Sequence, residues 1–175
     1  MMNRATALLV IDLQCDYFPG GKFPLWEAEA CQARLVETIR NCRRLGMPVI
    51  FIRHVAAGET APFFVPGSAG TELTAAIRAA APDAPVVEKH FADSFYQTTL
   101  EATLQKLGVE KLLVAGMMTQ NCVTFTALSE AAAKYRPVIL SDCCTTVSEM
   151  IHLIALNALA IRVPLRTAAE ALTGR

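Results

Sequence analysis

Short apolar runs alternate along the chain with segments that have a helical repeat, and this alternation limits the fold more than any other feature. The runs 5–11, 49–52 and 111–115 are apolar at almost every position, which is typical of strands buried on both faces of a sheet. Between the first two runs, residues 26–45 carry apolar residues three or four positions apart, which predicts an amphipathic helix. Strands that alternate with helices predict a three-layer α/β/α sandwich around a six-stranded, mostly parallel sheet.

The expected elements fill one domain of ordinary size, residues 1–175. Glycine and proline mark several boundaries. Gly46 and Pro48, for example, end the first helix before the second strand begins. We expect strands at 5–11, 49–52, 86–87, 111–115, 137–140 and 161–163, and helices at 26–45, 71–81, 98–107, 121–135, 149–158 and 167–172.

The charge of the chain excludes several classes of partner. The 16 basic and 16 acidic residues give a formal net charge of zero, so the chain has no electrostatic footprint for nucleic acid. No apolar stretch approaches the ~18 residues that a membrane span needs, and the first residues lack the features of a signal peptide. We therefore expect a cytoplasmic protein with a small-molecule substrate and no nucleic-acid or membrane partner.

The hydrophobic residues make up 53% of the chain, a high fraction for a soluble domain. Together with an alanine-rich helical segment at 126–133, this fraction predicts a homo-oligomer. The six cysteines form no Cys-x-x-Cys pair and no zinc-like spacing, so we expect free thiols. Cys143 and Cys144, expected just after the fifth strand, are interpreted as packing residues.

The carboxyl ends of the expected strands are where chemistry should be sought, because ligands bind there in parallel α/β sheets. The first strand ends at Asp12, the second at Arg53 and His54, and the third at Lys89. The fourth strand leads through a tight turn to Cys122. Ionisable groups and a thiol should therefore converge at one edge of the sheet.

Cys122 is the leading candidate for a nucleophile. Its thiol would lie in the first turn of the helix that follows the fourth strand. Unpaired N–H groups and the helix dipole favour an anion there, which lowers the pKa of a thiol. The same N–H groups could bind the oxyanion of a tetrahedral intermediate. The alternative is a buried cysteine that only packs.

Asp12 and Lys89 are the expected partners of the thiol. A carboxylate that ends a buried strand suits a base that takes the thiol proton. A cation beside the thiol and the carboxylate would favour thiolate and stabilise developing negative charge. Taken singly, Asp12 also fits a cap of the following loop, and Lys89 fits a solvated lysine at a loop start. Their shared edge of the sheet favours the catalytic interpretation.

Three motifs surround these residues: Val-Ile-Asp-Leu-Gln at 10–14, Gly-Met-Met-Thr-Gln-Asn-Cys-Val at 116–123, and Lys89 followed by Ser94, Phe95, Thr98 and Leu100. In their order and context they resemble the isochorismatase-like cysteine hydrolases, over about residues 6–172. The resemblance implies a triad in which Asp12 is the base, Lys89 the electrostatic partner and Cys122 the nucleophile. It also implies a cis peptide bond between Met117 and Met118, and an oxyanion hole formed by the N–H groups of Met118 and Cys122.

Four residues complete the expected site as substrate-binding residues. Gln14 and Phe18 follow Asp12 closely and should line the pocket, since an aromatic residue packs on the substrate at this point in relatives. His54 could orient the substrate, or could instead be a partly buried histidine bonded to a loop carbonyl. Met117 lies in the nucleophile turn. Trp26 could close either the pocket or a subunit interface.

No metal or other cofactor is expected. Nicotinamidases of the same superfamily bind a metal through an Asp-x-His pair and a further histidine near the second strand. Residues 51–58 of this chain supply only His54 and no matching carboxylate, which also argues against nicotinamide as the substrate. Arg53 could form a salt bridge at the strand end or bind a substrate carboxylate.

These features predict a cysteine hydrolase that cleaves C–N bonds of a small amide, ureido or carbamoyl compound. Enzymes that hydrolyse isochorismate itself commonly lack the cysteine, so Cys122 favours acyl transfer. Two alternatives remain. One is vinyl-ether hydrolysis of the isochorismate type, by Asp12 and Lys89 without the thiol. The other is a non-catalytic oligomeric binding protein with a vestigial site.

Overall fold

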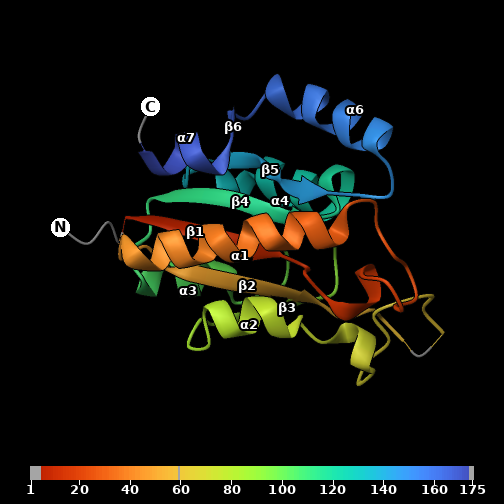
Figure 1. Ribbon diagram of the computed structural model, residues 1–175. Helices are drawn as coiled ribbons and strands as arrows, with labels where there is room; N and C mark the ends of the chain where they lie inside the picture. The colour runs from red at the N-terminus through yellow and green to blue at the C-terminus, as the bar shows by residue number, and fades with distance from the viewer. Residues whose placement is uncertain (1–4, 59, 174–175) are drawn as a thin grey trace.

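A six-stranded sheet organises the part of the chain that the computed structural model describes, residues 5–58 and 60–173. Every strand pairing in this part is parallel, and the strand order is β3-β2-β1-β4-β5-β6. The expected α/β fold class is confirmed (Figure 1). The strands are β1 (Thr6–Ile11), β2 (Val49–His54), β3 (Val86–Lys89), β4 (Lys111–Met117), β5 (Val138–Thr145) and β6 (Leu165–Arg166).

Helices cover both faces of the sheet because successive side chains along a strand point to opposite sides. On β1, Leu8 and Val10 belong to an apolar cluster with α1, α2 and α7, whereas Leu9 and Ile11 belong to one with α3, α4 and α6. Figure 1 shows α1 in front of the strands. The helices are α1 (Ala28–Arg44), α2 (Ala75–Ala80), α3 (Leu100–Lys106), α4 (Thr124–Leu128), α5 (Glu130–Ala133), α6 (Glu149–Ala160) and α7 (Ala168–Thr173).

The sixth strand does not lie where the sequence predicts it. The expectation of a strand at 161–163 is wrong, because α6 continues to Ala160 and the chain then turns. The N–H groups of Arg162 and Val163 both donate to the carbonyl oxygen of Leu159, which closes the turn. The strand follows as Leu165–Arg166.

The fifth strand is longer than expected and continues from residue 140 to Thr145. Cys143 and Cys144 are therefore buried within β5, and their expected place after the strand is wrong. Asp142 interrupts the apolar pattern because its carboxylate accepts a hydrogen bond from the N–H of Ala168 at 2.9 Å. The polar residue therefore joins β5 to the start of α7.

The expected continuous helix over 121–135 is also wrong. The chain first forms a π-helical turn, η3 (Thr119–Val123), and continues into α4. Ser129 then has an extended backbone, with ψ of 138°, and separates α4 from α5. Cys122 consequently lies in a π turn and not in the first turn of a regular α-helix.

Gly116 brings β4 unusually close to β1, its neighbour in the sheet. It pairs with Ile11 and has a φ of +124°. A Cβ atom at this position would lie 2.1 Å from the carbonyl oxygen of Ile11, so only glycine fits. The close approach holds the turn after β4 beside Asp12, which follows β1 directly.

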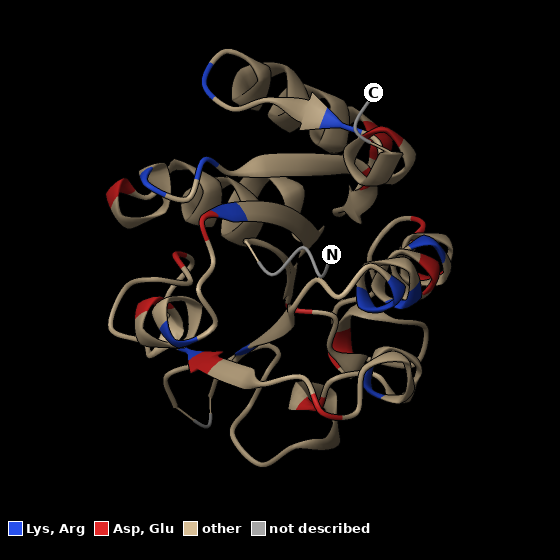
Figure 2. Ribbon diagram, turned by 90° about the vertical axis from the view of Figure 1, so that its left-hand side faces the viewer, with Lys and Arg blue, Asp and Glu red and all other residues tan. Residues whose placement is uncertain are grey.

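Charged residues of both signs are interspersed over the ribbon (Figure 2), in keeping with the net charge of zero. Among the helices of the described residues, none is long and apolar enough to cross a membrane.

Candidate active site

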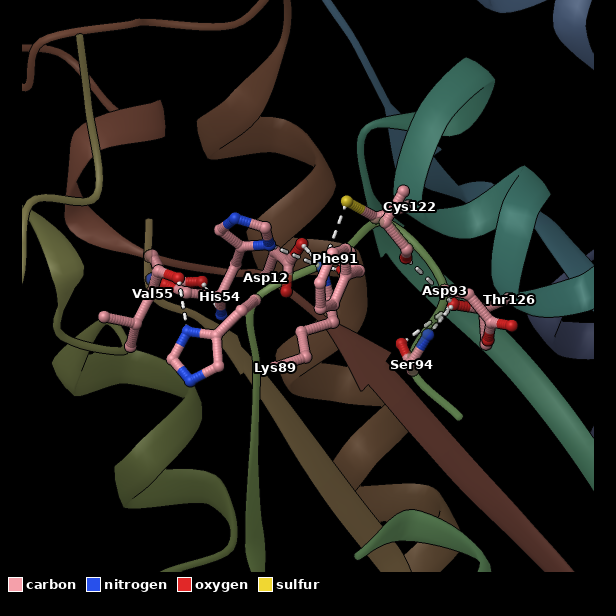
Figure 3. A network of polar contacts seen from close by, with 12 residues as sticks. Asp12, His54, Val55, Lys89, Phe91, Asp93, Ser94, Cys122 and Thr126 are labelled. Atoms are coloured by element: carbon pink, nitrogen blue, oxygen red, sulfur yellow. Dashed lines mark hydrogen bonds and ion pairs between the residues drawn. The ribbon is translucent and has the colours of Figure 1, made fainter. Parts of the chain in front are cut away.

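The structure brings the three expected catalytic residues together at the carboxyl ends of the strands. Asp12 follows β1, Lys89 ends β3 and Cys122 lies in η3 after β4. The Nζ atom of Lys89 lies 2.9 Å from Oδ2 of Asp12 and 3.1 Å from Sγ of Cys122. All three side chains are buried and point toward one another (Figure 3).

The Lys89 ammonium is the centre of the cluster. Besides Asp12 and Cys122, it contacts Nδ1 of His54 at 3.0 Å and donates to the carbonyl oxygen of Phe91 at 3.1 Å. Burial alone would lower the pKa of Lys89. The negative charges of Asp12 and of ionised Cys122 outweigh burial and raise it. Lys89 therefore remains protonated, with three N–H groups shared among four acceptors.

The thiol of Cys122 is held in its protonated form. Burial first, and then the negative charge of Asp12, raise the pKa of Cys122 to about 12, although Lys89 acts in the opposite direction. The lowered thiol pKa expected from a helix N-terminus is therefore wrong. At neutral pH the resting site combines a thiol, a carboxylate and an ammonium, and a base is needed to generate the thiolate.

The turn after β4 fixes the position of Cys122. The peptide bond between Met117 and Met118 is cis. The carbonyl oxygen of Met118 accepts hydrogen bonds from the N–H groups of Asn121 and Val123, at 3.0 and 3.3 Å. These bonds wind the chain into η3 around Cys122. An oxyanion hole formed by the N–H groups of Met118 and Cys122 stays a prediction.

A buried hydrogen bond joins the lysine motif to the cysteine motif. The N–H and the hydroxyl of Ser94 both contact Oγ1 of Thr126, at 3.0 and 2.8 Å (Figure 3). Both side chains are completely buried. Because Ser94 lies five residues after Lys89 and Thr126 lies four after Cys122, this pair fixes the spacing between the ammonium and the thiol.

The family model of the Isochorismatase domain matches residues 6–170 of this chain. The chain belongs to the isochorismatase family. An uncharacterised isochorismatase-family protein from Bacillus subtilis, YddQ, is 36% identical over 84% of this chain and 81% of its own length. The crystal structure of a putative isochorismatase hydrolase from Oleispira antarctica superposes with a TM-score of 0.88 at 32% identity, covering 99% of this chain and 98% of the other.

Named enzymes also occur among the relatives of this isochorismatase-family hydrolase. Nicotinamidase 3 of Arabidopsis thaliana is 29% identical over 86% of this chain and 78% of its own length. More distant relatives are named maleamate amidohydrolase, from Pseudomonas putida, and ureidoacrylate amidohydrolase, from Variovorax paradoxus, with 27% and 26% identity.

His54, the last residue of β2, is neutral in the site. Burial first, and then the charge of Lys89, lower the pKa of His54 to about 4. Since an ammonium can only donate, Nδ1 of His54 must accept its hydrogen bond and the ring proton must reside on Nε2. This arrangement leaves an Nε2–H donor beside the cluster of Asp12, Lys89 and Cys122, as a role in orienting substrate would require.

Asp12, His54 and Cys122 also offer three ligand atoms that lie within 4.8 Å of one another, close enough to share a metal ion. The ammonium of Lys89 already contacts all three residues, at 2.9 to 3.1 Å. A metal ion at this point would have to displace a completely buried cation, so the residues do not fit a metal. The expectation that the site uses no metal stays a prediction.

The other three expected substrate-binding residues are largely enclosed. The amide of Gln14 donates to the carbonyl oxygens of His54 and Thr71 and accepts from the N–H of His54. Both N–H groups of Gln14 are therefore used within the protein, and its role is to hold β2 against the loop at 71. Met117 and Phe18 are buried in one apolar cluster. Contact of these residues with substrate stays a prediction.

Two residues near the site are missing from the expected set. Tyr17 is buried, and its pKa is raised by burial and then by the charges of Asp12 and Cys122, which places its phenol within electrostatic reach of both. Its ring lies 4.6 Å from that of Phe64, measured between centroids. Asp16, also buried, accepts hydrogen bonds from the N–H groups of Phe64 and Lys22, at 2.7 and 3.1 Å. Both lie within five residues of Asp12, the signal that could have identified them.

Arg53 and Trp26 lie at the periphery. Arg53 pairs with Glu88 at 2.9 Å and with Glu72 at 3.3 Å, which favours the salt-bridge interpretation over a substrate carboxylate. Trp26 is partly exposed, and its ring centroid lies 6.0 Å from that of His152 on α6.

Proposed function

We propose that this isochorismatase-family protein is a cysteine hydrolase that cleaves the C–N bond of a small amide, ureido or carbamoyl compound. The observation that carries the proposal is the buried ammonium of Lys89, which lies between a carboxylate and a thiol at 2.9 and 3.1 Å. A packing cysteine would not need two charged partners, and burying them has a large free-energy cost.

The first half of the proposed reaction forms an acyl-enzyme. Asp12 takes the thiol proton while the sulfur of Cys122 attacks the carbonyl carbon, forming the C–S bond. The N–H groups of Met118 and Cys122 stabilise the oxyanion. When the intermediate collapses, the C–N bond breaks and Asp12 gives the proton to the leaving nitrogen. Lys89 stays protonated throughout and stabilises whichever of the carboxylate and the thiolate is charged.

The second half releases the acid. Asp12, again a carboxylate, removes a proton from a water molecule that attacks the acyl carbon. The C–S bond breaks, and the proton returns to sulfur. The same carboxylate thus serves as base and acid in both halves, which requires it to lie near both the thiol and the leaving group.

The substrate class follows from the nucleophile and from the relatives. Relatives named as amidohydrolases of maleamate and ureidoacrylate favour a small acyclic amide or ureido compound. The ammonium of Lys89 contacts Asp12, His54 and Cys122, whose side chains could otherwise bind a metal ion together. Its position argues against a metal-dependent mechanism like that of nicotinamidases. The Nε2–H of His54 is suited to donate a hydrogen bond to a carbonyl or carboxylate oxygen of such a substrate.

The test is a screen of small amides, ureido acids and carbamoyl compounds for ammonia release. The wild-type protein should turn over at least one of them, and quenching the reaction should trap an acyl adduct on Cys122 by mass spectrometry. Cys122→Ala should retain no turnover above background. Full turnover by Cys122→Ala would refute the proposal.

The two alternatives give different results when the same variants are compared. Vinyl-ether hydrolysis liberates no ammonia and must be followed by release of its carbonyl product. Vinyl-ether hydrolysis would survive in Cys122→Ser, whereas acyl transfer through sulfur would fall by orders of magnitude. A non-catalytic binding protein would show neither ammonia release nor an adduct with any compound, while still binding some of them in calorimetry.

A further inference from the structure

Phe64 has a backbone conformation that a bulky side chain rarely adopts. Its φ is +56°, in the left-handed region, and its ring is only 1% exposed. Hydrogen bonds hold both of its backbone groups. The N–H of Phe64 donates to Oδ2 of Asp16 at 2.7 Å, and its carbonyl oxygen accepts from the N–H of Ala56 at 3.0 Å. An unfavourable conformation that its surroundings enforce is a reason to look for a function.

The side chain of Asp16 joins the segments that meet here. It lies in η1 (Cys15–Tyr17), a short turn that follows β1. Besides the bond from Phe64, its carboxylate accepts one from the N–H of Lys22 at 3.1 Å. Gly70 lies so close to this carboxylate that a Cβ atom there would be 2.1 Å from Oδ1. In Figure 1 these segments, red to yellow, lie together beyond the ends of the strands. One buried side chain therefore fastens three parts of the chain.

The ring of Phe64, held in this way, packs against both Tyr17 and His54. The ring centroids lie 4.6 Å and 5.9 Å apart, respectively. His54 contacts the ammonium of Lys89, which in turn contacts the sulfur of Cys122 (Figure 3). The thiol residue is itself only 3% exposed. A molecule that reaches the sulfur beside His54 must therefore fit next to the ring of Phe64.

We propose that Phe64 limits the size of the substrate and that Asp16 is the positioning residue that holds Phe64 in place. A ring whose backbone is fixed at both its N–H and its carbonyl group is not free to move aside for a larger group. The inference rests on the proposed function in one respect, that Cys122 is the group a substrate must reach. It adds that the substrate is a compact amide, and that amides with a bulky group at this side of the site are excluded.

A purely structural role for Asp16 would have different consequences. Within the described residues, the hydrogen bonds to its carboxylate come only from backbone N–H groups. Its effect on a substrate must therefore pass through the segments that it holds. A positioning role predicts that Asp16 and Phe64 act as a unit, so that changing the second residue adds little once the first is changed.

Alkylation of Cys122 by two reagents of different size tests the proposal without any need for turnover. Iodoacetamide is a compact amide, and iodoacetanilide carries an added phenyl ring. Mass spectrometry of the peptide that contains Cys122 gives both rates and separates them from labelling of the partly exposed Cys15. Asp16→Ala and Phe64→Leu should each raise the rate with iodoacetanilide, relative to that with iodoacetamide, by about 10-fold or more, since steric fit in an apolar site has effects of this size.

The chain offers a matched control for each change. Asp142→Ala also removes a carboxylate that accepts from a backbone N–H, but this one holds α7. Phe51→Leu shortens a ring buried in the same apolar cluster, but this ring has α2 over it. Both controls should leave the ratio of the two rates unchanged. The double variant Asp16→Ala/Phe64→Leu should exceed Phe64→Leu by no more than about twofold.

Hydrogen–deuterium exchange measures the clamp directly. The N–H of Phe64 should exchange at least about 10-fold faster in Asp16→Ala than in the wild type, because it loses its acceptor, and should be unchanged in Asp142→Ala. Asp16→Asn retains one acceptor oxygen, so it should restore part of the protection and part of the size selectivity. Far-UV circular dichroism identifies any variant that does not fold. If Asp16→Ala does not fold, Asp16→Asn and Phe64→Leu decide the question.

Three outcomes would overturn the proposal. The first is a ratio of rates that neither Phe64→Leu nor the folded variants of Asp16 change. The second is an equal rise in Phe51→Leu or Asp142→Ala, which would mean general loosening of the protein. The third is a double variant whose effect is the full product of the two single effects. Failure of the proposed function would appear separately, as a wild type that releases ammonia from no amide, and would leave these ratios unaltered.

Discussion

Replacing Lys89 by methionine would remove the only cation that contacts Asp12 in the described structure. Both side chains are completely buried, and their charged atoms lie 2.9 Å apart. Removing one partner of a buried ion pair costs about 3–5 kcal/mol, because the other charge stays buried without compensation. For a chain of this size, such a loss lowers Tm by about 6–20 °C.

The free energy of unfolding should be measured by urea titration followed by circular dichroism at constant pH. The double variant Asp12→Asn/Lys89→Met leaves no buried charge and should recover at least about 2 kcal/mol relative to Lys89→Met alone. Lys134→Met is the control, because Lys134 pairs with Glu101 at the exposed surface, where such pairs contribute little. It should leave Tm unchanged.

Two results would refute this account of the site. One is a loss below about 1 kcal/mol in Lys89→Met, which would mean that the carboxylate is solvated or protonated in the folded protein. The other is a double variant no more stable than the single variant, which would mean that methionine disturbs packing and not charge balance. In the expected case, Lys89→Met is also inactive, since it lacks the cation that stabilises the carboxylate before the proton moves and the thiolate afterwards.

Three further predictions concern the thiol, the histidine and the sheet. Asp12→Asn removes the charge that opposes ionisation of Cys122, so iodoacetamide should alkylate the thiol faster at neutral pH than in the wild type, while turnover is lost; slower alkylation would contradict the assigned cause. With the pKa of His54 lowered to about 4 and that of an unfolded histidine about 6.5, the unfolded chain binds the extra proton between these values, so stability falls as pH falls through this window. In urea titrations from pH 4 to 7, His54→Gln should reduce the change in the free energy of unfolding by roughly 1–2 kcal/mol. An unchanged dependence of the free energy of unfolding on pH would contradict this prediction. Gly116→Ala places a Cβ atom 2.1 Å from a backbone oxygen of β1 and should cost more than about 3 kcal/mol, whereas Gly108→Ala, with a φ of +67° but open space, should cost about 1–2 kcal/mol.

The location of the site could be predicted from the sequence because parallel topology places strand ends together. Asp12, Lys89 and Cys122 are more than 30 residues apart in the chain, yet each follows or ends a buried strand, and the sheet brings them within hydrogen-bonding distance. Pocket residues were harder to choose. Gln14 lies near the site as predicted, but its side-chain amide forms hydrogen bonds with backbone groups of other segments and is not free to bind substrate. No local pattern reveals such a long-range partner. Tyr17 was missed although its position five residues after Asp12 could have identified it.

The errors in the fold share a physical cause. Apolar periodicity indicates where a side chain would be buried within one chain, and it fails where polar residues have long-range partners or apolar residues face outward. Asp142 shortened the predicted fifth strand, although its carboxylate caps α7. Ile161 suggested a sixth strand, although it is 83% exposed at the end of α6.

The electrostatics of the site determine how the proposed reaction must begin. Because burial and the charge of Asp12 raise the pKa of Cys122 above that of a free thiol, little thiolate is present at neutral pH for a direct attack. The proton must therefore move to Asp12 as substrate binds, between atoms that lie within 4.8 Å. Lys89 keeps the free-energy cost of this transfer low, because its ammonium contacts both the carboxylate and the sulfur. It therefore stays paired with a negative charge before and after the proton moves. In the proposed reaction the thiolate thus forms only as substrate binds. A buried thiol with a raised pKa also reacts slowly with oxidants, which protects Cys122 in the resting protein.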